Sequence, residues 1–430
     1  MKRTIVILLT LICSLATLKA QVNDGASVDT KALKAIKTNN YTDLKRSIAP
    51  LTKVMATKKI VALGEGTHGT AEFYKLRYWI TRILVEEKGF DRIAFENDLS
   101  DCWLLDRELP KRSNIDSLMK KYLLSIWQNK ETKELLQWVK KYNAGHRRKV
   151  VISGIDYVFS RPDVTVLKEL LSGTKAAALL DTLNGPILRA ATFQDEAWYG
   201  LNRADYRLNY DSLEKSSYSG YLLAGQLGKQ LEAIELPQQV KNDALLAITN
   251  LRQAFAPFYA SRAKKAEASR DSNMAYTVSA MMRTPGTKMI IWAHDGHVAK
   301  KPIYQGAVGG TGGYLRKMFP DQYFVLGTGT ATGTFAATTE PRDTYDNPMK
   351  AYALEAPLKD SWEKTLMDTK IPAFYFFPDQ FNNNRLIKPM RFVGYTPKSG
   401  ASTYDKVNMS DHFDAFLFIS DTHAATPLDQ

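Results

Sequence analysis

Six side chains that can take part in acid–base chemistry lie at or just after the ends of strand-like segments. They are Glu65, His68, Glu96, Asp156, His294 and His297. A histidine can take a proton from water, and a carboxylate can orient the ring and stabilise its cation. If the fold brings these groups together, their types indicate a site that hydrolyses a bond by general base catalysis.

The elements that must position these groups are short apolar runs rich in β-branched residues. The predicted strands are 58–64, 92–96, 149–156, 288–294, 322–327, 371–377 and 414–421. Continuous apolar runs of this length are typical of strands buried on both faces, as in a parallel sheet. The predicted helices between the early strands are 70–88, 101–109, 114–124 and 131–143. This alternation predicts an α/β fold, a mostly parallel sheet flanked by helices, in which reactive groups converge beyond the carboxyl ends of the strands.

The stretch 186–285 differs from the rest because strand signals vanish and helical spacing dominates, as in 216–234 and 242–260. We expect it to form an inserted helical lobe that makes one wall of the active-site cleft. The α/β core would then consist of 21–185 and 286–430.

Residues 1–20 have the layout of a secretory signal peptide. Lys2 and Arg3 come first, an apolar run 4–18 follows, and Ala20 offers a small residue at the cleavage point. We therefore expect an exported protein, either periplasmic or secreted. Export removes three basic residues and no acidic ones, so the formal net charge falls from +13 to +10. Only Cys102 then remains, which excludes an intramolecular disulfide.

The partners expected from charge and hydropathy are small molecules. The basic residues of the mature chain are scattered along the sequence, so we expect no nucleic acid partner. No segment after residue 20 is long and apolar enough to predict stable membrane insertion. Nothing in the sequence indicates the oligomeric state.

Arg77 lies on the apolar face of the predicted helix 70–88, four residues after Phe73 and seven before Leu84. A buried cation without a partner is costly, so Arg77 should meet a carboxylate. Glu65 and Glu96 are the candidates.

Two other chemistries are compatible with part of this set. GEGTHG (64–69) satisfies the G-x-G-x-x-G pattern of a dinucleotide-binding turn, although Glu65 would oppose a bound pyrophosphate. The glutamates and the H-x-x-H at 294–297 are also ligand types that zinc or manganese accepts. A nearby Arg77 would repel such a cation. A non-catalytic protein that binds an envelope component in a polar cleft remains a further alternative.

Metal-free transfer of an acyl group to water uses the whole set. His68 would be the base, with Glu65 or Glu96 as the group that holds its ring. The donors to the developing oxyanion would be His294, His297 or Arg77. The chain has no G-x-S-x-G segment, so a serine nucleophile is not indicated.

Seven stretches of the chain resemble the erythromycin esterase family and keep the family's order. They are ALGEGTHGTAEFYKLR (62–77), RIAFEND (92–98), GID (154–156), RDSNMA (270–275), IIWAHDGHV (290–298), GGYLRKMFPDQYFVLG (312–327) and FDAFLFISDTHAATPL (413–428). The resemblance implies hydrolysis of a macrolide lactone or a similar ester by metal-independent general base catalysis, with His68 as the base. It also implies an α/β core with an added helical lobe and a cleft between them. This chain departs from the family at Asp295, where an asparagine is common.

These observations lead to one assignment of roles. The expected catalytic residues are His68, Glu65, Glu96, Arg77, His294 and His297, and the expected substrate-binding residues are Asp156 and Arg270. We expect no cofactor and no metal, and a small-molecule ester or lactone as the substrate.

Overall fold

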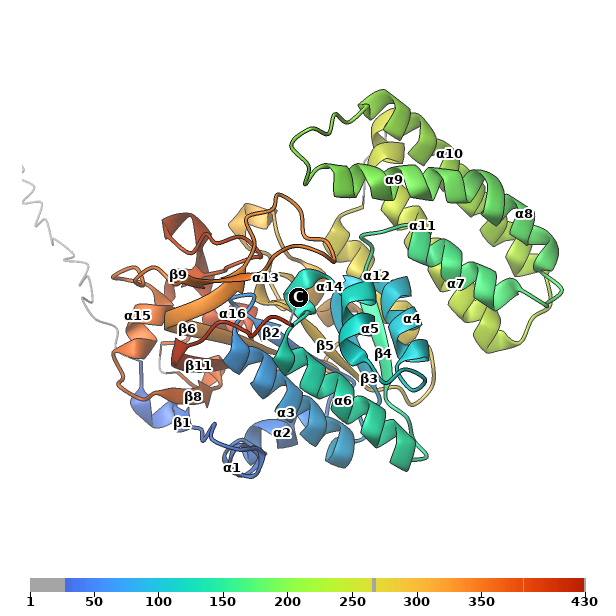
Figure 1. Cartoon of the computed structure of the whole chain (residues 1–430). Helices are drawn as coiled ribbons and strands as arrows, with labels where there is room; N and C mark the ends of the chain where they lie inside the picture. Colours follow the sequence, from blue (N-terminus) through green and yellow to red (C-terminus); the bar gives the residue numbers. More distant parts are fainter. Residues whose placement is uncertain (1–27, 265–267, 382, 429–430) are drawn as a thin grey trace, which may run out of the picture.

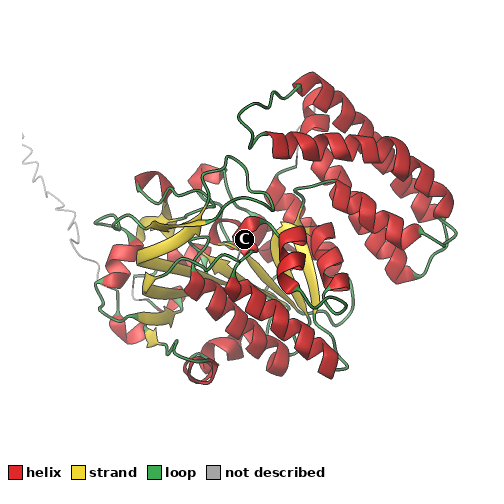
Figure 2. Ribbon diagram, viewed as in Figure 1, coloured by secondary structure: helices red, strands yellow, loops and turns green. Residues whose placement is uncertain are grey.

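The computed structural model describes residues 28–264, 268–381 and 383–428 (Figure 1). The predicted signal peptide, residues 1–20, lies outside the described residues. Figure 2 shows an α/β core of strands flanked by helices, with a separate group of helices beside it. Among the helices that the structure describes, none has the length and apolar composition that crossing a membrane requires.

The core is built on a nine-stranded sheet in the order β1-β8-β11-β6-β2-β5-β3-β4, with β7 paired to β6 outside this path. The strands are β1 (Lys34–Ala35), β2 (Ile60–Glu65), β3 (Arg92–Asp98), β4 (Val151–Asp156), β5 (Met289–His294), β6 (Tyr323–Ala337), β7 (Lys350–Ala353), β8 (Ala373–Phe376) and β11 (Ala415–Thr422). Those from β11 to β4 run parallel, and β1, β7 and β8 pair antiparallel. A hairpin of β9 (Ile387–Arg391) and β10 (Tyr404–Asn408) lies apart.

Helices cover both faces of the sheet, which explains the uninterrupted apolar runs. Val61 and Leu63 of β2 join one hydrophobic cluster, whereas Ile60 and Ala62 join another. Alternate side chains of a strand point to opposite faces, so both faces must be apolar. The first cluster continues into the helical lobe described below, and its helices next to the sheet are α1 (Tyr41–Ser47), α2 (Ala49–Ala56), α3 (Ala71–Lys88), α4 (Leu99–Glu108), α5 (Ile115–Tyr122) and α6 (Lys130–Gly145). Those of the second are α12 (Arg270–Met281), α13 (Asp295–Val298), α14 (Thr311–Met318), α15 (Trp362–Met367) and α16 (Met409–His412).

A helical lobe stands beside the core (Figure 1). Its helices are α7 (Arg161–Leu171), α8 (Leu180–Thr182), α9 (Leu188–Gly200), α10 (Tyr210–Ala233) and α11 (Gln238–Ala263). These helices span Arg161–Ala263, with α7 packed on α4 of the core as well as on α11, and α12 packs on the core. The boundaries 186 and 285 of the lobe stay a prediction.

Two buried carboxylates fix the connection from β4 to the lobe. Asp98 accepts hydrogen bonds from the backbone N–H groups of Val158 and Phe159, at 3.0 and 3.2 Å. Asp195 of α9 accepts from the next two N–H groups along the chain, at 2.7 and 2.9 Å. Four consecutive backbone donors are thus held by side chains of the core and of the lobe.

The predicted fold class is confirmed: the structure is α/β with a mostly parallel sheet. Every predicted strand is present. The largest difference is β6, predicted as 322–327 but extending to Ala337. Its second half is rich in glycine and threonine and is stabilised by pairing with β11 and β7 on its two sides.

Candidate active site

The parallel strands bring the predicted groups to one edge of the sheet. Glu65 ends β2 and His294 ends the neighbouring β5, and the two residues are paired in register. Glu96 lies near the end of β3 on the other side of β5. Since these strands are parallel, their carboxyl ends share one edge, which is why the sequence spacing could predict the cluster.

We define the Glu65 group as Glu65, His68 and Arg77. The Glu65 carboxylate accepts from Arg77 Nη2 at 2.9 Å and lies 2.8 Å from His68 Nδ1. Arg77 is 1% exposed, and its guanidinium carbon lies 4.7–5.4 Å from the ring centres of Tyr74, Trp127 and Trp292. The faces of these rings stabilise the Arg77 cation, and Glu65 is the carboxylate partner that the position of Arg77 on the apolar helix face predicted.

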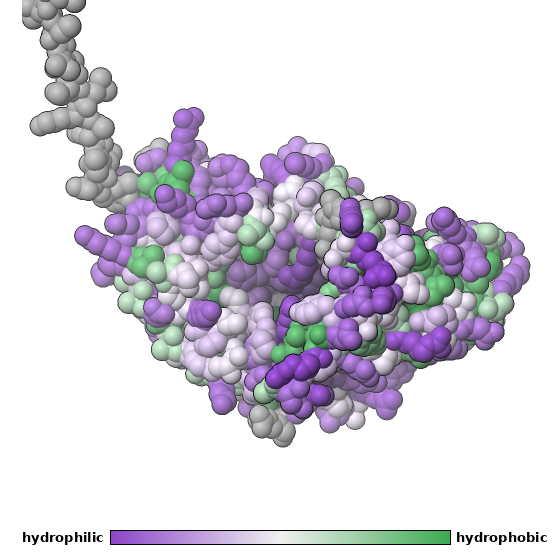
Figure 3. Space-filling model, turned by 90° about the horizontal axis from the view of Figure 1, so that it is seen from above, coloured by the Kyte–Doolittle hydropathy of each residue, from purple (hydrophilic) through white to green (hydrophobic). Residues whose placement is uncertain are grey.

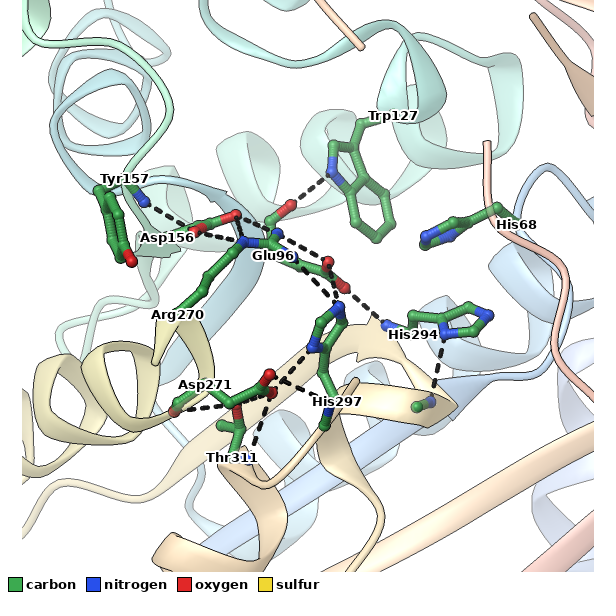
Figure 4. A network of polar contacts seen from close by, with 12 residues as sticks. His68, Glu96, Trp127, Asp156, Tyr157, Arg270, Asp271, His294, His297 and Thr311 are labelled. Atoms are coloured by element: carbon green, nitrogen blue, oxygen red, sulfur yellow. Dashed lines mark hydrogen bonds and ion pairs between the residues drawn. The ribbon is translucent and has the colours of Figure 1, made fainter. Parts of the chain in front are cut away.

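We define the Glu96 group as Glu96, His297 and Arg270. One oxygen of Glu96 lies 3.0 Å from Arg270 Nη2 and 3.3 Å from His297 Nε2. The other accepts the backbone N–H of His294 at 2.8 Å. Figure 4 shows these side chains meeting from β3, α13 and the start of α12.

Two further aspartates, which are not part of the Glu96 group, bond to its arginine and its histidine. Asp156, at the end of β4, accepts from Nε of Arg270 at 3.0 and 3.1 Å and also pairs with its Nη2. Asp271 lies 2.8 Å from His297 Nδ1 (Figure 4). Both nitrogens of His297 thus face carboxylates.

The charges within the Glu96 group act on one another. Burial disfavours the cation of His297, but Glu96 and Asp271 outweigh burial and raise the pKa of His297. Burial likewise opposes the anion of Glu96, yet the charges of His297, Arg270 and His68 hold the pKa of Glu96 well below its usual range. The group is therefore fixed as paired ions.

His294 behaves differently from the other two histidines. Its ring centre lies 4.7 Å from that of His68, and its Nδ1 accepts the backbone N–H of Gly296 at 3.2 Å. Burial, reinforced by the neighbouring His68, keeps the pKa of His294 well below its ordinary value. His294 is a neutral ring packed beneath His68, and its buried Nε2 makes no hydrogen bond with the described residues.

A cavity of about 990 Å³ joins the core to the lobe, and Figure 3 shows the molecule hollowed between them. Its polar floor consists of His68, Glu96, Asp156, Arg270, His294 and His297. Its lobe wall is mainly apolar and includes Ala197, Trp198, Leu201, Leu213, Ala254 and Phe258. Glu65 and Arg77 do not line the cavity, so Arg77 is not placed to donate to an oxyanion and acts through Glu65.

The GEGTHG turn is packed in a way that leaves no room for a dinucleotide. Gly69 has a φ of +72°, and a Cβ there would lie 2.0 Å from the carbonyl oxygen of Ala336. The N–H groups of Gly66, His68 and Gly69 all donate within the protein. These glycines thus allow close packing against β6 and do not cradle a phosphate.

The donor set also bears on the metal alternative. Both carboxylate oxygens of Glu65 are used, one by His68 and one by Arg77. Within the described ranges, no three His, Cys, Asp or Glu side chains are arranged to hold a metal ion.

Comparison with known proteins agrees with this geometry. The sequence model of the family described as Erythromycin esterase matches residues 85–422. The chain belongs to the erythromycin esterase family. The match begins after GEGTHG, so the position of His68 in the site rests on the geometry above.

Relatives of this erythromycin esterase family member include esterases and proteins of known structure. Erythromycin esterase type II of Escherichia coli is 26% identical over 368 residues, covering 79% of this chain and 84% of that protein. A Bacillus cereus protein has a TM-score of 0.77 at 19% identity and covers 93% of this chain and 97% of its own. An erythromycin esterase mutant in its open conformation has a TM-score of 0.70 at 19% identity, covering 93% and 100%. Membership of the family makes this chain a hydrolase, and the structures confirm the fold.

Sequence reasoning missed two carboxylates of this family member's site. Asp271 lies within RDSNMA, a stretch that had been singled out, and its place beside Arg270 was the available signal. Asp343 lines the cavity from an irregular segment after β6, where no periodicity or motif marks it.

Proposed function

We propose that this chain is an exported hydrolase that cleaves a carboxylic ester or macrolactone, with His68 activating the attacking water. One observation carries the proposal. His68 lines the cavity with Nδ1 held by Glu65, which leaves Nε2 as the nitrogen that can take a proton from water. Arg77 Nη2 donates to the other oxygen of Glu65 at 2.9 Å and holds the carboxylate in place, so that it can stabilise the imidazolium as it forms.

The Glu96 group supplies positive charge on the same floor. When water attacks an ester carbonyl, negative charge develops on the carbonyl oxygen, and preorganised donors lower the barrier most. Arg270 has a side chain that is 43% exposed and His297 one that is 12% exposed, so both can reach a bound ester. We assign the oxyanion contact to these two residues rather than to His294 or Arg77.

The walls indicate the kind of substrate. The lobe contributes mainly apolar side chains to the cavity, while the charged groups lie on the core floor. A substrate with a bulky apolar body and one polar ester group matches this division. Because the Escherichia coli relative is named an erythromycin esterase, macrolactones are the first candidates to test.

The decisive experiment compares the mature chain with His68→Asn on a panel of macrolactones, alkyl esters and 4-nitrophenyl esters. Loss of the base should lower kcat by about 10²- to 10⁴-fold. The matched control is His423→Asn, because His423 also pairs with a glutamate but lies exposed, away from the cavity. A folded His68→Asn variant with the parent's kcat would exclude this mechanism.

Metal independence and export need separate measurements. Full activity in a chelator, with no metal detected by elemental analysis, supports water activation by His68 alone. For export, the amino terminus of the protein from the periplasm or medium should begin near Gln21. Protein that is retained inside the cell with Met1 intact contradicts the export proposal.

A further inference from the structure

Asp343 is a carboxyl group of the cavity that belongs to neither the Glu65 group nor the Glu96 group. It lines the cavity together with His68 and Glu96, and it is only partly exposed. Its Oδ1 accepts a hydrogen bond from the Ser125 hydroxyl at 2.5 Å. Attack of water on an ester needs one proton removed from the water and one supplied to the leaving oxygen, and the roles assigned so far name a group only for the removal.

The segment 342–345 holds Asp343 firmly in position. A side-chain amide of the lobe, that of Asn202, donates to its first carbonyl at 3.0 Å. From the core, the backbone N–H of Ser125 and the side-chain amide of Gln128 donate to its last two carbonyls, at 2.9 and 2.6 Å. The segment is therefore anchored on both sides of the cavity, which fixes the carboxyl group between lobe and floor.

The surroundings of Asp343 favour its protonated form. Burial raises the pKa of Asp343 to about 7, and the negative charge of Glu96 adds to this, whereas Ser125 and His68 oppose it. The guanidinium of the adjacent Arg342 lies 4.6 Å from the ring centre of Trp198. Near neutral pH a substantial fraction of the molecules thus carries a proton on this carboxyl.

We infer that Asp343 is the general acid that protonates the departing alcohol oxygen. The inference rests on the proposed function, since it concerns the second half of the same ester cleavage. The bond from the acyl carbon to the alkoxy oxygen breaks, its electron pair stays on that oxygen, and the Asp343 proton moves there. The proton of the attacking water is on His68, which releases it to solvent, and the Asp343 carboxylate takes up a proton from solvent before the next turnover.

The choice of leaving group tests this role. Two esters of one acyl group are compared, an ethyl ester and a 4-nitrophenyl ester, because nitrophenolate departs without being protonated. Asp343→Asn should lower kcat for the ethyl ester by about 10²- to 10³-fold and leave the nitrophenyl ester nearly unchanged. Asp346→Asn is the matched control, since Asp346 is an exposed carboxylate on the same loop that does not line the cavity. It should leave both reactions unchanged.

A second measurement needs no variant. In the parent, kcat for the ethyl ester should fall as the pH rises through the pKa of Asp343, whereas kcat for the nitrophenyl ester should show no such fall. Equal loss on both esters in Asp343→Asn, or no loss on either, overturns the inference while the proposed function stands. A parent that cleaves no ester or lactone overturns the proposed function, and the inference with it.

Discussion

The Glu65 group and the Glu96 group are built from the same three residue types, one glutamate between a histidine and an arginine. They differ in how many carboxylates each histidine meets. His68 has one, at Nδ1, whereas His297 has Glu96 at one nitrogen and Asp271 at the other. A ring held on both sides by anions is stabilised as a cation, and a ring held on one side keeps a nitrogen for a proton.

The arginines differ in the same sense. Arg77 is enclosed by three aromatic rings, and among the residues that the structure describes its guanidinium bonds only to Glu65. Arg270 bonds to Asp156 as well as to Glu96 and is open to the cavity. In the proposed mechanism the Glu65 group thus supplies a proton acceptor, His68, together with the buried charge of Arg77. The Glu96 group instead presents the charge of Arg270 to the cavity. The comparison teaches that burial and partner number, rather than residue type, divide the roles.

Glu65→Gln should have the largest effect, because it leaves Arg77 buried without an anion. We expect a loss of about 3–5 kcal/mol in the free energy of unfolding, measured by urea denaturation. In the folded fraction, kcat should fall by about 10²- to 10⁴-fold because His68 loses its orienting carboxylate. Glu65→Gln/Arg77→Met should recover stability but not activity. If the double variant is no more stable than the single one, Arg77 is not an uncompensated charge in Glu65→Gln.

Glu96→Gln should cost less stability, about 1–2 kcal/mol, because Arg270 keeps Asp156 and remains partly in water. Activity should fall by about tenfold as the two cations lose a common partner. Urea denaturation and kcat measurements compare the losses of stability and activity in the two glutamate variants. Equal losses for Glu65→Gln and Glu96→Gln would remove the distinction between the groups.

Asp271→Asn sharpens the comparison by giving His297 a single carboxylate, as His68 has. The pKa of His297, now raised by Glu96 and Asp271, should move down toward its ordinary value. Activity on a nitrophenyl ester should then decline at a lower pH than in the parent, and an NMR titration of the ring reports the shift directly. Thr311→Val is the control, since it removes only the bond from Thr311 to Asp271. The same decline in that variant would point to the loop rather than to His297.

Asp295→Asn should have the smallest effect. Burial raises the pKa of Asp295 well above its usual value and so favours the neutral acid, which an asparagine amide resembles in shape, and the variant should therefore support similar activity. A raised folded pKa gives stability that is present at low pH and lost as pH rises through that pKa. The melting temperature of the variant should therefore drop less than the parent's as the pH is raised from about 4 to about 9. Parallel curves would show that Asp295 does not titrate there.

The sequence could predict the parts of the site that follow from regular structure. Strand ends in a parallel sheet share an edge, so Glu65, Glu96 and His294 could be placed together. The 3.6-residue spacing put Arg77 on a buried face and so required an anion. These two periodicities are local properties of the chain, and the sequence displays them directly.

The remaining parts depend on contacts between distant segments. Asp343 is positioned by Asn202 of the lobe and Ser125 of the core, on a segment without periodicity. The sequence also does not show that α7, an amphipathic helix after a strand, packs on both α4 of the core and α11 of the lobe. The choice of oxyanion donor in the proposed mechanism also depends on which arginine faces the cavity, Arg77 or Arg270. The sequence does not show this, because the exposure of each side chain is set by the assembled fold.

The pairing of Asp156 with Arg270 has a mechanical consequence. Asp156 is the residue at which the chain leaves the sheet for the lobe, and Arg270 begins the helix to which it returns. Their contact joins the two chain segments that connect the core to the lobe, and the same guanidinium also donates to Glu96. In the proposed mechanism Arg270 also contacts the oxyanion, so a bulky substrate that displaced the lobe would displace this arginine as well.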